Sequence, residues 1–155
     1  MARIASARPL QDGSGTPTTA GVEAPSNSAV FQRIWELYAA GRGPEILEHL
    51  DPAIEWRPVL HDPARYHGHA GVRRWAAARR RAWKSVTILL EDVSEIDGCV
   101  VASGRVAAYD HCGNKVVDSA VACATEIHDG LVVRAAAFVE RDAALRWVSG
   151  RAALP

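Results

Sequence analysis

The sequence predicts an α+β protein, in which helices pack against one face of an antiparallel sheet. Helical periodicity dominates the chain between residues 28 and 83, interrupted by one short strand-like segment. From residue 86 to 139, strand-like segments alternate with short turns, and a last helical pattern follows. At 155 residues, the chain has the length of one domain with a substantial core.

The first predicted helix begins after Ser28, a residue type that caps helices, and ends at Gly41. Its apolar side chains recur at positions i, i+3, i+4 and i+7, which is typical of an amphipathic helix. They are Phe31, Ile34, Trp35 and Tyr38. Pro44 opens a second, shorter helix that we expect to end near Leu50.

A short strand over residues 53–58 (AIEWRP) is stopped by Pro58, and residues 59–68 form a loop. The next helix is predicted from Ala70 to Trp83, with Val72 and Trp75 on its apolar side. Its basic residues are expected to form a solvated face, with binding of an anionic ligand or RNA as the alternative, which the absence of stacking aromatics beside them disfavours. They are Arg73, Arg74, Arg79, Arg80, Arg81 and Lys84.

Four strands are predicted after this helix, over residues 86–96, 99–109, 115–127 and 131–139. The turn signals between them are Asp97-Gly98, the stretch 110–114 and His128-Asp129-Gly130. Short turns join consecutive strands into an antiparallel meander. Residues 141–148 form the last predicted helix.

Composition excludes several classes of function. The 18 Lys and Arg residues balance the 18 Asp and Glu residues, so net charge favours neither nucleic acid nor anionic membrane as a partner. The three cysteines lack CxxC spacing, which favours a reducing, cytoplasmic environment. Residues 1–27 are rich in Gly, Ser, Thr and Pro and are predicted to be a disordered tail, with a docking arm as the alternative.

Several stretches resemble the SnoaL-like branch of the nuclear transport factor 2-like superfamily. They are FQRIWELYAAGR (31–42), LDPAIEWRP (50–58), YHGHAGVRRW (66–75) and IHDGLVVRAAAFVERDAAL (127–145). The resemblance implies a cone-shaped domain over residues 28–150, with a curved sheet wrapped around helices and an apolar pocket inside. It also implies a homodimer through the outer sheet face, near Tyr109, Arg134 and Phe138.

His67-Gly68-His69 raises the question of a metal site. The two histidines are two residues apart, whereas a helical pair of ligands needs a spacing of four, so no metal and no cofactor are expected. The resemblance implies that Gly68 allows the loop to approach the helix closely. His69 is expected to cap the helix or face solvent, and His67 to lie at the pocket rim.

Alternation along the strands predicts which side chains face the pocket. The small apolar faces are those of Val100, Ala102, Gly104, Val106 and Ala108, and of Val133, Ala135, Ala137 and Val139. The two faces of the strand over residues 115–127 are less distinct, and there the resemblance selects Ser119, Val121 and Cys123 as inward. On the first strand it selects Glu55 and Arg57, with Trp56 packing elsewhere. The expected substrate-binding residues are Tyr38, Tyr66, His67, Val106, Ala108, Ser119, Val121, Cys123, Ala135 and Ala137.

The known catalytic sets of the fold are absent. The positions that match the catalytic groups of ketosteroid isomerases hold Arg57, Ile34 and Cys123. No inward acid matches the Asp-Arg-Asp set of limonene epoxide hydrolases either. Glu55 is the candidate general base or substrate acceptor, oriented by Arg57, and a structural ion pair is the alternative. Two functions stay open: a cofactor-independent lyase, isomerase, cyclase or hydrolase for an apolar polyketide- or terpenoid-like molecule, or a non-catalytic ligand-binding or dimerisation module.

Overall fold

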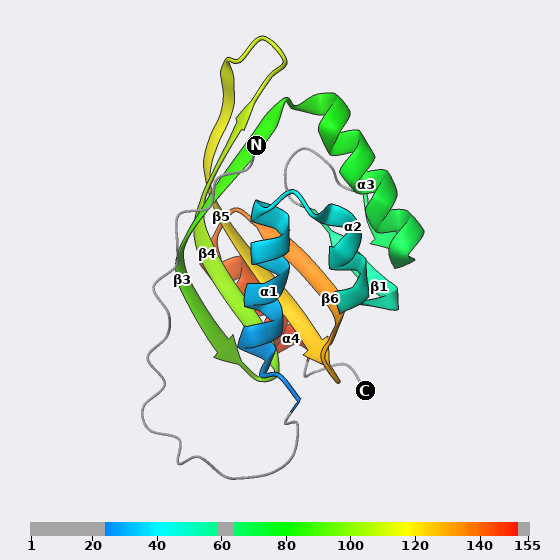
Figure 1. Cartoon of the computed structure of the whole chain (residues 1–155). Coiled ribbons are helices and arrows are strands. Elements are labelled where there is room, and N and C mark those ends of the chain that lie inside the picture. The colour runs from blue at the N-terminus through cyan, green and yellow to red at the C-terminus, as the bar shows by residue number, and fades with distance from the viewer. Residues whose placement is uncertain (1–23, 59–63, 152–155) are drawn as a thin grey trace.

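The structure, a computed structural model, describes residues 24–58 and 64–151. The elements follow one another in the predicted order, with a short additional strand before the third α-helix (Figure 1). The helices are α1 (Asn27–Ala39), α2 (Gly43–Ile46), the 3-10 turn η1 (Leu47–His49), α3 (Gly68–Ala82) and α4 (Arg141–Arg151). The strands are β1 (Leu50–Arg57), β2 (Tyr66–His67), β3 (Ser85–Ile96), β4 (Cys99–Tyr109), β5 (Lys115–His128) and β6 (Leu131–Phe138).

The six strands form one sheet in the order β2-β1-β6-β5-β4-β3. The meander β3-β4-β5-β6 is antiparallel throughout, as predicted. β1 joins it in parallel with β6, and β2 extends the sheet beyond β1. The predicted α+β class is therefore confirmed.

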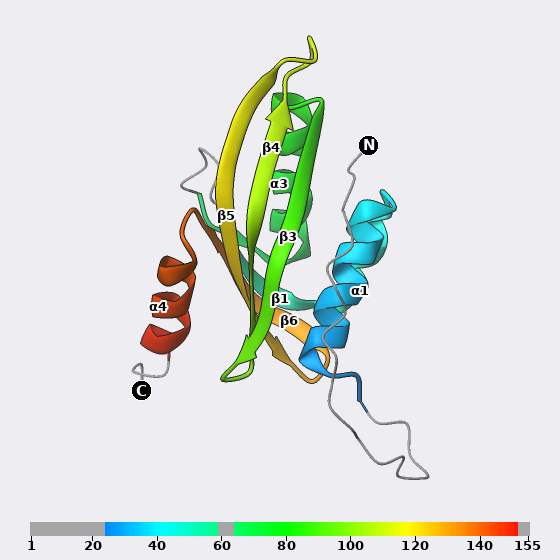
Figure 2. The ribbon, with the colours of Figure 1, turned by 90° about the vertical axis from the view of Figure 1, so that its left-hand side faces the viewer.

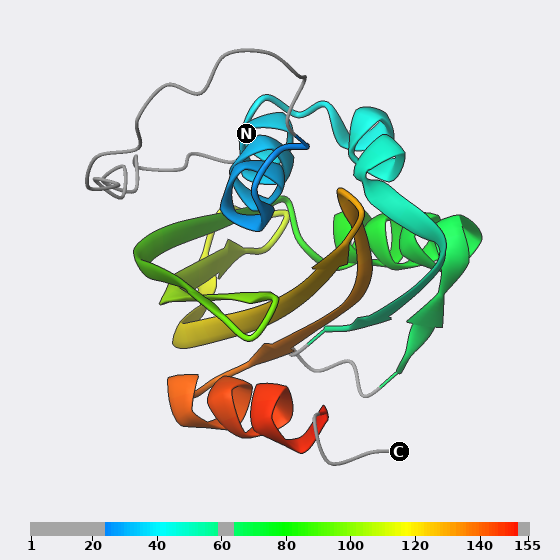
Figure 3. The same cartoon turned by 90° about the horizontal axis from the view of Figure 1, so that it is seen from below.

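Helices cover both faces of this sheet, whereas the sequence predicted helices on one face only. Figures 2 and 3 show α1, α2 and α3 on one side and α4 on the other. The inner core joins Val30 and Phe31 of α1 to Leu90, Val100 and other sheet residues. On the outer face, Ala144 and Val148 of α4 pack on small side chains of β4 and β5, which are Cys99, Val101, Ala122 and Ala124.

The docking of α4 changes the expectation for a dimer. Phe138 packs against the cluster formed with α4, and Arg134 lies 4.8 Å from the ring centroid of Trp147. Both side chains are therefore engaged within the chain. α4 does not contact the part of the outer face near Tyr109, at the opposite end of β4 from Cys99.

The start of α1 differs by two residues from the prediction. Ser26, not Ser28, caps the helix, because its Oγ accepts a hydrogen bond from the backbone N–H of Ala29 at 3.2 Å. Ser28 lies inside the helix and donates to Glu95 Oε2 at 3.0 Å. Most of the predicted tail, residues 1–23, lies outside the described residues.

Gly68 follows β2 as the first residue of α3, and its close contact is with β1. Its φ is +66°, and a Cβ there would lie 3.0 Å from the carbonyl oxygen of Pro52. The next residue, His69, neither caps the helix nor faces solvent: its half-buried ring lies with Nε2 2.9 Å from the Leu50 carbonyl oxygen. Because a carbonyl only accepts, Nε2 is the donor, and the bond ties α3 to the start of β1.

Bulges shift the facing of two strands. The register between β5 and β6 shifts between Glu126 and Ile127, so Val132, rather than the predicted Val133, enters the inner core. Val139, also expected to face inward, is 50% exposed beyond the end of β6. In β3 the register shifts between Leu90 and Asp92, opposite Gly104.

None of the helices in the described part of the chain is long and apolar enough to cross a membrane.

Candidate ligand cavity

A cavity of about 570 Å³ lies between the inner sheet face and the helices α1 and α3. Its walls are almost entirely apolar and rich in aromatic side chains. From the helices they include Phe31, Ile34, Trp35, Tyr38, Val72, Trp75, Arg79 and Trp83. From the strands they include Ile54, Trp56, Val106, Val121, Cys123, Thr125, Ala135 and Ala137.

Six of the predicted substrate-binding residues line this cavity. They are Tyr38, Val106, Val121, Cys123, Ala135 and Ala137. Ala108 and Ser119 lie on the same inward faces of β4 and β5 but outside the cavity lining. Ala108 is fully buried against Val86 and Val106, so no space is left beside it for a ligand. Strand alternation therefore located the sheet wall of the cavity in β4 and β6, and the family resemblance located it in β5.

Glu55 and Arg57 do not line the cavity, and the prediction that they face inward is wrong. Ile54 is buried in the inner core, and Ile54, Trp56 and Pro58 line the cavity instead. Side chains alternate along β1, so Glu55 and Arg57 point to the outer face. Apolar residues occupy every second position from Ile54 to Pro58, and this local signal indicated the correct face, whereas the family resemblance selected the opposite one.

On the outer face, Glu55 and Arg57 line a separate, smaller recess of about 160 Å³ together with Arg65, His67 and Arg134. Glu55 pairs with Arg134 rather than with Arg57, at 3.7 Å between Oε2 and Nε. The Arg57 guanidinium instead lies 5.8 Å from the centroid of the Phe138 ring. The Glu55 side chain is 53% exposed, so solvent screens this ion pair.

Tyr66 and His67 also lie away from the cavity, so the expectation that they contact its ligand is not supported by their placement. His67 faces the outer recess as the cross-strand partner of Glu55. The backbone of Tyr66 packs closely against Gly71 of α3, and its ring lies 6.0 Å from the Arg74 guanidinium. In the described ranges, no three His, Cys, Asp or Glu side chains are grouped in a way that could hold a metal ion.

Trp56 separates the two spaces, because it lines both the cavity and the outer recess. Its ring meets that of Trp75 edge to face, with centroids 5.1 Å apart at 76°. The indole Nε1 is buried without a hydrogen-bond partner among the described residues. The Trp56 side chain thus forms an apolar wall between the cavity and the outer recess, and its indole N–H makes no hydrogen bond to a described residue on either side.

Arg79 and Tyr38 supply the main polar groups of the cavity wall. Arg79 Nη2 donates a hydrogen bond to the Tyr38 hydroxyl. The guanidinium also lies 4.9 Å from the Tyr38 ring centroid and 5.5 Å from that of Trp75. Sequence analysis placed Arg79 on a solvated face, although its position four residues after Trp75 put it on the apolar side of the helix.

The titratable groups of the cavity stay protonated at neutral pH. Burial raises the pKa of the Tyr38 hydroxyl above its usual value, although the nearby Arg79 guanidinium acts in the opposite direction. Burial raises the pKa of the Cys123 thiol to about 12, so it is not a thiolate nucleophile. None of the cavity-lining residues that the structure describes is a carboxylate or a histidine. The described wall offers hydrogen-bond donors and one cation, and no general base.

Comparison with solved structures shows the same architecture in proteins of low sequence identity. A nuclear transport factor 2-like protein of unknown function from Burkholderia pseudomallei superposes with a TM-score of 0.66 at 15% identity, over 77% of this chain and 95% of that one. This chain has the nuclear transport factor 2-like fold. No family model and no curated protein matches its sequence.

Two further structures with the nuclear transport factor 2-like fold bear on ligands. A proposed SnoaL-like polyketide cyclase from Jannaschia sp. CCS1 has a TM-score of 0.62 at 15% identity, covering 84% of this chain and 98% of its own. TerC, crystallised with polyporic acid, has a TM-score of 0.65 at 17% identity, covering 79% of this chain and 98% of its own. Identities this low establish a shared fold and leave the ligand of this chain open.

Proposed function

We propose that this protein binds a small, mostly apolar, ring-containing molecule in the cavity between α1, α3 and the sheet. The observation that carries the proposal is the cavity itself, about 570 Å³ in volume and lined by aromatic and aliphatic side chains. Ligand sites for small molecules have volumes of roughly 300–1,000 Å³ and mostly apolar walls with a few polar groups. The co-crystal of TerC with polyporic acid supports the proposal by showing a small molecule together with this fold.

Binding without turnover is favoured over the reactions considered for the sequence. Proton abstraction needs a base with a pKa near the working pH. The only carboxylate proposed for this role, Glu55, lies on the outer face of the sheet, and Tyr38 and Cys123 are held protonated. The described wall therefore recognises a ligand without supplying the acid–base pair that an isomerase or hydrolase of this fold would need.

A second candidate, a cyclase, draws support from the Arg79–Tyr38 pair. Two donors beside an apolar cavity can stabilise negative charge that develops on an oxygen, as an oxyanion hole does. Such an enzyme would act on a substrate that is already an enol or enolate and needs no protein base. The proposed cyclase among the structural neighbours is compatible with this alternative.

The binding proposal is tested with the uncharged fluorophore N-phenyl-1-naphthylamine, whose emission rises in apolar surroundings. We expect saturable binding to the full chain. Val121→Trp should weaken it by about tenfold or more, because the indole would fill space in the cavity. Thermal melting of each variant monitors folding.

Two variants serve as controls. Ala120→Trp places the same side chain on the next residue of β5, which is exposed and faces outward, and Glu55→Gln changes a residue of the outer recess. Both should bind the fluorophore as the unmodified protein does. Equal losses in Val121→Trp and Ala120→Trp, or no saturable binding at all, would show that the cavity is not a ligand site.

A further inference from the structure

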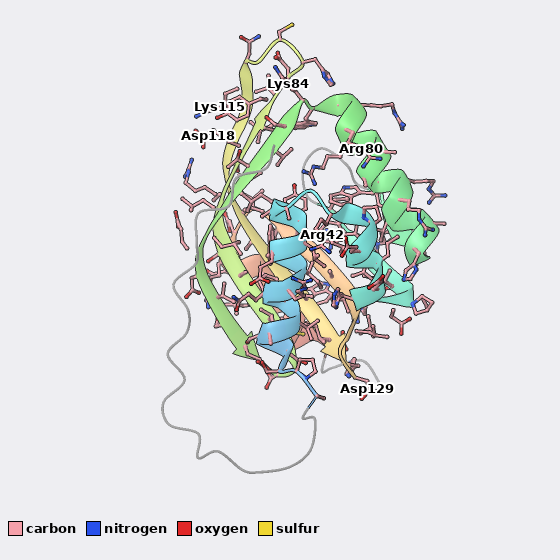
Figure 4. All side chains as sticks on the ribbon, in the orientation of Figure 1. Arg42, Arg80, Lys84, Lys115, Asp118 and Asp129 are labelled. Atoms are coloured by element: carbon pink, nitrogen blue, oxygen red, sulfur yellow. The ribbon has the colours of Figure 1, made fainter. Side chains whose placement is uncertain are left out.

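The charged groups in the cavity wall indicate what charge a ligand of this cavity carries. Arg79 is the one charged side chain among the described residues that line it. The neighbouring cations of α3, Arg80 and Arg81, are exposed, whereas Arg79 is half-buried between the rings of Tyr38 and Trp75. The position of Arg80, the residue after Arg79 on α3, is labelled in Figure 4.

Within the described ranges, no carboxylate lies within ion-pair distance of Arg79. Other arginines of this protein do form ion pairs: Arg134 pairs with Glu55, and Arg141 pairs with Asp92 at 3.3 Å. A guanidinium keeps its charge under all ordinary conditions, and removing it from water is costly unless an opposite charge compensates. The aromatic rings on either side offset part of this cost but do not neutralise the charge.

The hydrogen-bond geometry leaves donors available for a ligand. A guanidinium has five N–H groups, and one of them is used by the Tyr38 hydroxyl. Because that hydroxyl accepts from Arg79, its own O–H is left to donate in a different direction. Arg79 and Tyr38 both line the helix wall of the cavity, so their remaining donors lie beside the space that a ligand would fill.

We propose that the ligand of this cavity is an apolar ring compound carrying one ionised acidic oxygen, such as an enolate, phenolate or carboxylate, and that Arg79 binds this oxygen with Tyr38 as the second donor. The proposal rests on the cavity being the ligand site, and it adds the charge of the ligand. The rings of the ligand occupy the aromatic chamber, and the anion compensates the Arg79 charge that the described residues leave unpaired.

A matched pair of fluorophores separates the charge from the apolar contacts. 1-Anilinonaphthalene-8-sulfonate and N-phenyl-1-naphthylamine share their ring system, and only the first carries an anionic group. We expect the full-length protein to bind the sulfonate compound more tightly. Arg79→Met should weaken sulfonate binding roughly 10- to 100-fold, the range for a lost charge-assisted contact, and change binding of the neutral compound by less than about threefold.

Three variants control this comparison. Arg80→Met removes a charge from the exposed residue next to Arg79 and should leave both affinities unchanged, which accounts for nonspecific attraction of an anion to α3. Arg79→Lys should retain most of the preference for the sulfonate compound, because it keeps the cation if not the fork. Tyr38→Phe removes only the hydroxyl and should weaken sulfonate binding by less than Arg79→Met does.

The outcomes distinguish this inference from the proposed function. If the neutral fluorophore binds and Val121→Trp blocks it, but Arg79→Met lowers both affinities equally or neither, the cavity binds ligands without selecting anions and the inference is wrong. If neither fluorophore binds, the proposed function is wrong, and the inference that rests on it is wrong as well. Asp62 is an acidic residue outside the described ranges. If Asp62→Asn raised the sulfonate affinity several-fold, a carboxylate of the protein itself would already compensate the Arg79 charge, and the inference would be wrong.

Discussion

Replacing Gly104 by alanine should disrupt the sheet at the β3 bulge. Gly104 lies in the middle of β4, opposite the point where the register of β3 shifts between Leu90 and Asp92. A Cβ on Gly104 would lie 1.8 Å from the backbone oxygen of Leu89 and 3.0 Å from the Cα of Leu90. The obstacle is backbone, so no change of side-chain rotamer relieves it.

The size of the effect follows from this distance. Real Cβ atoms essentially never approach another heavy atom within 3.0 Å, so β3 and β4 must separate locally by about 1.2 Å, the difference between 1.8 and 3.0 Å. Overpacking of this kind costs about 1–3 kcal/mol. Breaking one or two hydrogen bonds of the ladder adds about 1 kcal/mol each. A loss of about 2–5 kcal/mol should lower the melting temperature by roughly 5–15 °C in a domain of this size.

Thermal and urea unfolding of Gly104→Ala would measure this loss. Gly150→Ala is the matched control, because the same Cβ added in α4 meets no atom within 4 Å. It should leave stability unchanged or raise it slightly, since alanine favours helix more than glycine does. A Gly104→Ala variant that melts within about 2 °C of the unmodified protein would refute the account of the bulge.

Two other properties can be predicted from the same structure. Cys112 is exposed and should react readily with a disulfide reagent at pH 8, whereas buried Cys99 should react only on unfolding. Cys123 is partly buried, and because its thiol pKa is raised to about 12 it should react much more slowly than Cys112; a second thiol that reacts as fast as Cys112 would contradict this. The rate at Cys123 should rise with pH towards that value, because the thiolate is the reactive form. We also propose that the chain forms a homodimer through the outer sheet face beyond α4, where Leu89, the cross-strand partner of Arg105, is 39% exposed. Light scattering that gives the monomer mass of 16.7 kDa at micromolar concentration, or Leu89→Glu without effect on the mass, would count against it.

Much of the fold is predictable from local sequence. Apolar residues at helical spacing indicated α1 and α3, and the turn signals Asp97-Gly98 and Asp129-Gly130 separated the strands correctly, with both glycines at a φ of +77°. The alternation of small apolar residues also placed Val106, Ala135 and Ala137 in the cavity wall, whereas Val121 and Cys123 were selected by the family resemblance. These features depend on neighbours in the chain, so periodicity and turn chemistry are sufficient to predict them.

The residues of the candidate site were harder to predict. The family resemblance predicts the wrong inward face of β1, whereas the alternation of Ile54, Trp56 and Pro58 indicates the correct one. The spacing of Arg79 from Trp75 indicates the apolar side of α3, but nothing in the sequence of α3 shows that Tyr38 of α1 lies beside it. A pairing of this kind is made only when two elements far apart in the chain pack together.

The sequence by itself determined the order of the elements, their periodicity and the apolar character of the cavity. Tertiary structure decided the parallel pairing of β1 with β6, the shifted facing of β3 and β6, the placement of α4 on the outer face, and the single cation of the described cavity wall. The physical reason is that a bulge reverses the facing of the residues beyond it, and its position depends on the backbone of the adjacent strand, as the contact between Gly104 and Leu89 shows. Such contacts between distant segments are not encoded in the local pattern of either strand.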